Sequence, residues 1–367
     1  MNSNTSGSTE FALLPVPARK LLYVIMRQAW AGTLRSKTPG VATLPEVYEA
    51  CGLEVNEIYP LLHVLRDSGF IDIQGDYPFE ELKLIGVPAE HRISVNGVEL
   101  ALWEWLGEGQ PILFCHGTGL HGRCWDRVIA RLAGHHCLAL DLRGHGRSDK
   151  PGSPYFWRSF GQDVAAAAAS LGLSGAIGVG HSMGGHAVTL AAALRPQAFS
   201  ALLLLDPVIR SQDAYVGPWK GAGFVAKRRN RWSSPGEMFD RFENRPPFDS
   251  WDRAVLRDYC EYGLLPDGDG FVLACAPAVE AEIYENGPLP NADIYGEIAA
   301  IQIPVHVARA GKRFEPGDFM RASPTTPELA SKFADGTDLL LPENSHFIPM
   351  EAPALTARLI ADILNSR

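Results

Sequence analysis

The chain has 367 residues, which is too long for one ordinary domain and predicts about two. Hydrophobic residues make up 46% and charged residues 20%, a composition typical of a globular protein with a large core. The net charge of −9 argues against a general attraction to nucleic acid or to anionic membranes.

Three features favour a cytoplasmic protein that does not bind a membrane. Residues 1–10 are polar and lack the basic and apolar regions of a signal peptide. No run of about 18 apolar residues occurs, so no membrane-spanning helix is expected. The six cysteines form no C-x-x-C pair, and we expect them to be reduced.

The first part of the chain has the pattern of a small separate domain. Residues 1–14 are expected to form a disordered arm. Three helical patterns and a strand hairpin then follow one another, over residues 15–30, 44–52, 56–69, 70–73 and 82–85. This order of elements resembles the winged helix-turn-helix family over residues 15–88.

From residue 89 the pattern changes to strands separated by helical stretches. A hairpin is expected to turn at Asn96-Gly97. Apolar runs of the kind that buried parallel strands show lie at Pro111–Cys115, Cys137–Asp141, Ala176–Gly180, Ala201–Asp206 and Ile303–Ala308. We expect an α/β fold with a doubly wound, mostly parallel sheet from residues 89–206 and 301–367. Residues 207–300 interrupt the alternation and are expected to form an inserted helical cap.

The motif with the clearest chemistry is Gly180-His181-Ser182-Met183-Gly184. It follows an apolar run and precedes a helical pattern, the context in which G-x-S-x-G forms a nucleophile elbow. The turn at such an elbow is so tight that only glycine leaves room on either side, here Gly180 and Gly184. Ser182 is therefore the predicted nucleophile.

Two further motifs match those of one enzyme family. His116-Gly117-Thr118-Gly119 follows the first apolar run, and Asp141-Leu142-Arg143-Gly144-His145-Gly146 opens a D-x-R-G-H-G-x-S motif. Together with the elbow, they resemble the α/β-hydrolase family. The resemblance implies that the backbone N–H groups of Thr118 and Met183 form the oxyanion hole. It also implies a structural role for His116 and Gly117.

A serine hydroxyl needs a base and the base needs an acid, in the family order serine, acid, histidine. The last histidine of the chain, His346, lies between the last apolar strand and a helical pattern, and it is the predicted base. The acid stays open. Asp206 follows an apolar strand before the cap, whereas Glu315 and Asp318 follow the next one with a shifted spacing.

The resemblance implies a serine hydrolase that cleaves a carboxylic ester of moderate size and apolar character through an acyl-enzyme. Thioester, lactone, amide and C–C bond hydrolysis share the same groups and remain alternatives. We expect no cofactor and no metal, because no H-E-x-x-H motif, P-loop or G-x-G-x-x-G follows a strand. The basic run Lys227–Arg231 is expected to be a solvated face, with acidic-substrate recognition as the alternative.

The role of the first domain is also open. Residues 1–90 contain seven Lys or Arg and eleven Asp or Glu, a net charge of −4. Because reading DNA needs basic and amide side chains, we expect no nucleic-acid partner. Homodimerisation, or a wall that shapes substrate access, is the favoured role. A regulator that joins a winged helix to a ligand-sensing hydrolase-like domain is the alternative function.

Overall fold

The computed structural model describes most of the chain: residues 41–51, 53–67, 71–74, 81–84, 88–132, 134–314, 318 and 320–366, with Ala18, Leu21 and Ile25. The chain divides into two units. The smaller ends at Glu90 and also contains Glu104–Glu108, and the larger comprises the rest. The arm expected over residues 1–14 lies outside the described residues, and so does most of the helix expected over residues 15–30.

The smaller unit contains two helices and a three-stranded antiparallel sheet in the order β1-β3-β2. Its elements are β1 (Val41–Thr43), α3 (Leu44–Cys51), α4 (Val55–Asp67), β2 (Ile71–Gln74) and β3 (Glu81–Leu84). Helical Ala18, Leu21 and Ile25 are buried with the apolar faces of α3 and α4 in one core. Strand β1 lies at residues for which the sequence pattern predicted no strand. The winged-helix assignment stays a prediction.

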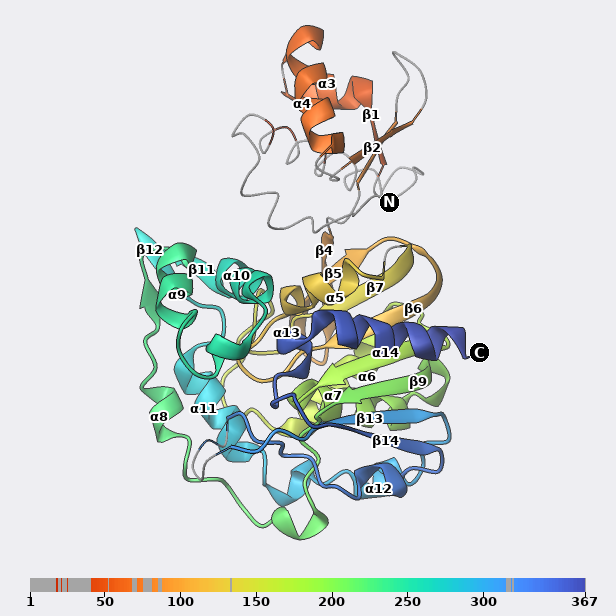
Figure 1. Ribbon diagram of the computed structural model, residues 1–367, viewed down its shortest axis with the longest axis vertical. Helices are drawn as coiled ribbons and strands as arrows, with labels where there is room; N and C mark the ends of the chain where they lie inside the picture. Colours follow the sequence, from red (N-terminus) through yellow and green to blue (C-terminus); the bar gives the residue numbers. More distant parts are fainter. Residues whose placement is uncertain are drawn as a thin grey trace. The chain divides into compact units, whose positions relative to one another are not determined.

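An eight-stranded sheet organises the larger unit, as the mostly parallel pattern of apolar runs predicted (Figure 1). Its order is β14-β13-β9-β8-β6-β7-β5-β4. The strands are β4 (Ala89–Val95), β5 (Val98–Trp105), β6 (Glu108–Cys115), β7 (His135–Leu140), β8 (Ala176–His181), β9 (Phe199–Leu205), β13 (Val305–Ala310) and β14 (Gly336–Leu341). Strands β6, β8, β9, β13 and β14 lie side by side in that order, and each neighbouring pair is parallel. The carboxyl ends of these strands therefore meet at one edge, where α/β proteins place their sites.

Helices surround this sheet. They are α5 (Asp126–Ile129), α6 (Trp157–Ser170), α7 (Met183–Leu194), α13 (Ile348–Glu351) and α14 (Pro353–Asn365). Helices α6 and α7 pack closely, because a Cβ at Gly161 would lie only 2.7 Å from the Leu190 side chain. No helix in the described part of the chain is long and apolar enough to cross a membrane.

The segment between β9 and β13 is not purely helical, which corrects the expectation of a helical cap. It contains α8 (Gly223–Ala226), α9 (Pro235–Phe242), α10 (Arg253–Tyr262), α11 (Pro277–Asn286) and α12 (Tyr295–Ile298), and also β10 (Arg231–Trp232), β11 (Leu264–Asp267) and β12 (Gly270–Leu273). These strands form an antiparallel sheet in the order β10-β12-β11. The β11–β12 hairpin turns at Gly268, whose φ of 63° suits glycine. Trp232 and Trp251 are 3% and 5% exposed and belong to an apolar core that this segment shares with Leu120, Cys124, Phe347 and Met350.

Candidate active site

Ser182 stands at the junction of β8 and α7, in a backbone conformation that few residues adopt. Its φ of 56° and ψ of −122° lie outside the regions favoured by L-residues. The neighbouring glycines make this turn possible. A Cβ at Gly184 would come within 2.1 Å of the Cys115 carbonyl oxygen, and a Cβ at Gly180 within 2.5 Å of the Gly184 oxygen. Ser182 is 6% exposed.

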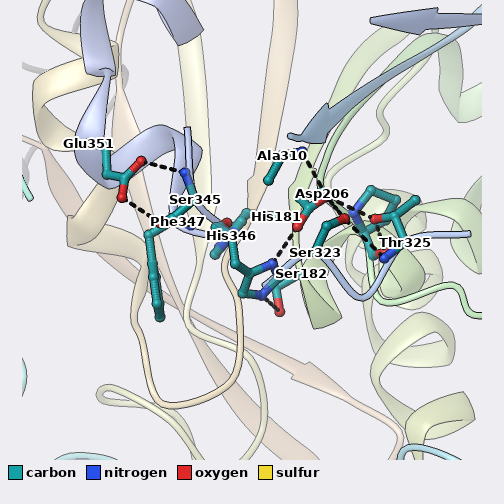
Figure 2. A network of polar contacts seen from close by, with 11 residues as sticks. His181, Ser182, Asp206, Ala310, Ser323, Thr325, Ser345, His346, Phe347 and Glu351 are labelled. Atoms are coloured by element: carbon teal, nitrogen blue, oxygen red, sulfur yellow. Dashed lines mark hydrogen bonds and ion pairs between the residues drawn. The ribbon is translucent and has the colours of Figure 1, made fainter. Parts of the chain in front are cut away.

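His346 links Ser182 to Asp206 (Figure 2). Its Nδ1 donates to Asp206 Oδ2 over 2.7 Å, and its Nε2 lies 3.0 Å from Ser182 Oγ. A carboxylate only accepts hydrogen bonds, so the proton of the neutral imidazole sits on Nδ1. Nε2 is thereby left with a lone pair that accepts from the serine hydroxyl. The hydroxyl, the imidazole and the carboxylate thus stand in the order that proton transfer from a serine to a histidine would require.

The buried carboxylate of Asp206 has several hydrogen-bond donors. Asp206 directly follows β9 and is 0% exposed. Its Oδ1 accepts from the Ala310 amide at 3.0 Å, from Ser323 Oγ at 2.5 Å and from Thr325 Oγ1 at 3.1 Å (Figure 2). Hydrogen bonds of this kind offset the cost of burying a charge and fix the carboxylate toward His346.

Two other acids were proposed from the sequence, Asp318 and Glu315. Asp318 accepts from Arg321 Nε at 2.6 Å in an ion pair. Glu315 lies outside the described residues. Among the described carboxylates proposed for this role, Asp206 is therefore the one in contact with His346.

Thr118 and Met183 lie side by side next to the elbow. Thr118 Oγ1 is 3.5 Å from Met183 Sδ. A Cβ at Gly117 would meet Ser182 Cβ at 2.9 Å, which places the loop directly against the serine. In the described part of the chain, neither the Thr118 nor the Met183 backbone N–H has a hydrogen-bond partner. Two free N–H groups beside the serine match an oxyanion hole.

Two buried histidines hold the loop that contains Thr118. His116 Nδ1 donates to the Gly117 oxygen at 2.8 Å, and its Nε2 accepts from the Leu142 amide at 3.0 Å. His145 Nε2 accepts from the Gly119 amide at 3.0 Å. Burial lowers the pKa of both imidazoles to about 3, so both are neutral near pH 7.

The loop of His346 is held from two sides. On one side, His181 Nε2 donates to the His346 carbonyl oxygen at 2.8 Å. On the other, the Glu351 carboxylate accepts from the backbone N–H and the hydroxyl of Ser345 (Figure 2). Sequence analysis assigned no role to His181, although it lies in the elbow motif, or to Glu351, which follows His346 by five residues. Among the described residues, no three His, Cys, Asp or Glu side chains gather as metal ligands.

Comparisons with known proteins agree with this geometry. The model of the alpha/beta hydrolase family matches residues 112–359. The non-heme haloperoxidase of Rhodococcus erythropolis is 40% identical over 95 residues, which cover 25% of this chain and about a third (34%) of that protein. The AB hydrolase superfamily protein YisY of Bacillus subtilis (strain 168) is 26% identical over 232 residues, or 59% of this chain and 80% of that protein.

A solved structure shows the same fold over most of the chain. E-2-(acetamidomethylene)succinate hydrolase superposes with a TM-score of 0.61 at 20% identity, covering 76% of this chain and 99% of that one. The family match extends over more than half of the sequence and contains Ser182, Asp206 and His346. The chain therefore belongs to the α/β-hydrolase family.

Proposed function

We propose that the protein is a serine hydrolase that cleaves a carboxylic ester through an acyl-enzyme. The observation that supports this most strongly is the contact of His346 Nε2 with Ser182 Oγ at 3.0 Å, with Asp206 on the opposite ring nitrogen. A serine hydroxyl is a poor nucleophile near neutral pH, and an adjacent base oriented by an acid is what activates it.

In the first half of the reaction, Ser182 Oγ attacks the ester carbonyl carbon while His346 Nε2 takes the hydroxyl proton. Asp206 stabilises the imidazolium that forms. The negative charge on the former carbonyl oxygen is met by the Thr118 and Met183 amides, worth about 3 kcal/mol for each donor. His346 then gives its proton to the leaving alcohol, and the acyl group stays on Ser182.

In the second half, water replaces the alcohol. The water oxygen attacks the acyl carbonyl carbon while His346 Nε2 takes a proton from the water. The same two amides hold the oxyanion. The proton then returns to Ser182 Oγ as the carboxylic acid leaves. Since the same groups act on thioesters, lactones, amides and some C–C bonds, substrate measurements have to define the scissile bond.

A peroxide-dependent reaction is the second candidate, because the relative from Rhodococcus erythropolis is called a non-heme haloperoxidase. Hydrogen peroxide would replace water as the nucleophile on the acyl-enzyme and release a peracid. Adding peroxide to the ester assay distinguishes the two. Formation of peracid, detected by its oxidation of halide, would favour this second candidate.

The test of the main proposal is hydrolysis of p-nitrophenyl esters from acetate to long acyl chains. Wild type should turn over at least one of them, and Ser182→Ala should not. Ser331→Ala, at an exposed serine away from the elbow, is the matched control and should behave as wild type. The acyl chain length that is hydrolysed fastest indicates the length of the acyl pocket. Trp232 and Trp251 are buried and leave almost no exposed surface with which to line such a pocket. Absence of turnover by folded wild type would favour the ligand-sensing alternative.

For the smaller unit we propose homodimerisation or control of substrate access. The net charge of −4 over residues 1–90 supports a role other than DNA binding. Sedimentation of the full chain over a range of concentrations tests dimerisation. If the protein shifts the electrophoretic mobility of random duplex DNA at 0.1 M salt, the proposal that nucleic acid is not a partner is wrong.

A further inference from the structure

Glu351 lies at the end of α13, five residues after the predicted base, and joins the loop of that base to another part of the chain. Its Oε2 accepts from the Ser345 backbone N–H at 2.9 Å, and its Oε1 accepts from the Ser345 hydroxyl (Figure 2). Oε1 also accepts from the Ser250 hydroxyl at 2.8 Å. Ser250 belongs to the inserted segment between β9 and β13 and is 101 positions from Glu351 in the sequence. One carboxylate therefore connects the histidine loop with the inserted segment.

The inserted segment meets the histidine loop at the two residues after Ser250 as well. The ring centroids of Trp251 and Phe347 lie 5.3 Å apart, and the two residues are only 5% and 7% exposed. The Asp252 backbone N–H donates to the Met350 carbonyl oxygen at 2.9 Å. Successive residues of the inserted segment thus contact the histidine loop, and a displacement of one segment breaks contacts with the other.

The contacts of Glu351 fix the backbone on both sides of His346. On one side, Glu351 accepts directly from the Ser345 N–H. On the other side, the Phe347 backbone N–H donates to Ser345 Oγ at 3.2 Å, and that hydroxyl in turn donates to Glu351. A histidine side chain turns about only two torsions, so its ring follows the backbone that carries it. A shift of this backbone would move Nε2 from its position 3.0 Å from Ser182 Oγ.

The chemistry of these contacts requires a carboxylate. In the described part of the chain, Glu351 forms no ion pair, and its hydrogen-bond partners are one amide and two hydroxyls. A carboxylate only accepts hydrogen bonds, so its two oxygens can serve these donors at once. A glutamine in its place would have one acceptor oxygen and would turn its NH₂ group toward a donor.

The single proton of the Ser250 hydroxyl has two possible acceptors. The Pro247 carbonyl oxygen lies 3.1 Å from Ser250 Oγ, and Glu351 Oε1 lies 2.8 Å from it. The shorter distance and the negative charge favour Glu351, because hydrogen bonds to an ionised acceptor are shorter and stronger than those to a neutral one. The hydroxyl therefore helps to fix the place of the carboxylate.

We propose that Glu351 is a positioning residue for His346, and that the inserted segment contributes to this positioning through the Ser250 hydroxyl. Glu351 acts through the backbone that carries the imidazole and not on the reacting atoms. The inference rests on the role proposed above for His346 as the base. It gives the inserted segment a part in the reaction through its contact with the histidine loop.

Two variants at residue 250 separate the hydroxyl from the shape of the side chain. Threonine keeps the hydroxyl and valine has nearly the same shape without it, so any steric effect is common to both. Ser250→Thr should keep kcat on a p-nitrophenyl ester within about twofold of wild type, whereas Ser250→Val should lower kcat roughly 10-fold with KM little changed. Ser233→Val removes a hydroxyl from the Glu237 carboxylate elsewhere in the inserted segment, and this matched control should behave as wild type.

Glu351→Met removes the acceptor and keeps the length of the side chain. It should lower kcat roughly 10- to 100-fold, because more than one donor loses its partner. The double variant Ser250→Val/Glu351→Met should lose no more than Glu351→Met alone, since both changes act on one contact. Losses that multiply, or an effect of Glu351→Met without one of Ser250→Val, would overturn the part assigned to the inserted segment.

The leaving group distinguishes positioning of the base from a loss of folded protein. An alkoxide needs a proton from His346 as it leaves, whereas p-nitrophenolate leaves without one. Ser250→Val and Glu351→Met should therefore lower kcat/KM for an ethyl ester several-fold more than for the p-nitrophenyl ester of the same acid. Thermal unfolding shows whether the variants are folded. An equal loss on both esters identifies a structural role and overturns the inference.

The proton on His346 Nδ1 provides a readout that needs no turnover. Nuclear magnetic resonance of the full chain, with the signal assigned by its absence in His346→Gln, measures how fast this proton exchanges with water. Exchange should be at least about fivefold faster in Ser250→Val and Glu351→Met than in Ser250→Thr and wild type, because the contact with Asp206 opens more often. This result supports the inference even if wild type hydrolyses no ester, an outcome that refutes only the esterase proposal. Equal exchange in all of these proteins overturns the inference, whether or not esters are hydrolysed.

Discussion

Asp206→Asn tests which carboxylate orients the base. The three donors around Asp206 Oδ1 need an acceptor, so the oxygen of the new amide takes that position. Its NH₂ group then faces His346 Nδ1, which has to become an acceptor, and the ring proton moves to Nε2. In that tautomer Nε2 has no lone pair for the Ser182 proton. The structure thus predicts a catalytic loss with little change in shape.

The expected loss in kcat is about 10⁴-fold, as for an acid that sets the histidine tautomer. This corresponds to about 5 kcal/mol of transition-state stabilisation. The assay is kcat on the best p-nitrophenyl ester, with thermal unfolding to show that the variant folds. Asp318→Asn and Glu315→Gln are the comparisons and should stay within about threefold of wild type. A kcat for Asp206→Asn within tenfold of wild type, or a larger loss in Glu315→Gln, would refute the reasoning.

Three further predictions concern the elbow, its supporting histidine and the response to acid. Gly184→Ala should unfold the elbow, because the new methyl group would lie 2.1 Å from a backbone oxygen. The control Gly296→Ala adds a methyl group with no atom within 4 Å, so it should keep the activity and the melting temperature of wild type. His181→Phe removes the bond to the His346 carbonyl and should lower kcat about 10-fold with KM little changed, a split that steady-state kinetics measures. Burial lowers the pKa of His116 and of His145 from 6.5 to about 3. Between these two pH values each histidine binds a proton in the unfolded chain but not in the folded one, so the free energy of unfolding falls as the pH drops from 6.5 toward 3. Each should cost about 2 kcal/mol at pH 5, and equal urea midpoints at pH 7.5 and pH 5 would contradict this.

The features that the sequence predicted well are those fixed by local constraints. Buried parallel strands need continuous apolar runs. The predicted ends of β6, β8 and β9 therefore lie within three residues of the ends that the structure shows. The elbow was visible because close backbone contacts at Gly180 and Gly184 leave no alternative to glycine. His346 lies between the last strand and a helix, as the sequence pattern predicted, and its role as the base stays a prediction.

The features that the sequence left open depend on groups far apart in the chain. Asp206 could not be separated from Glu315 by spacing, because the donors that surround it, Ser323 and Thr325, come more than 100 residues later. The contact of Ser250 with Glu351 joins residues 101 positions apart and has no local pattern. The strands of the β11–β12 hairpin are only four residues long, too short for a period to be recognised.

The central claim is that the Ser182 hydroxyl is the nucleophile, and covalent labelling tests it most directly. The full chain is treated with a fluorophosphonate, which phosphonylates activated serines, and the intact mass and the labelled peptide are measured. The account predicts one adduct per chain on Ser182, loss of ester turnover in proportion to labelling, and no adduct in Ser182→Ala. An unlabelled wild-type protein that still hydrolyses esters, or an adduct on a different serine that accompanies loss of activity, would contradict it.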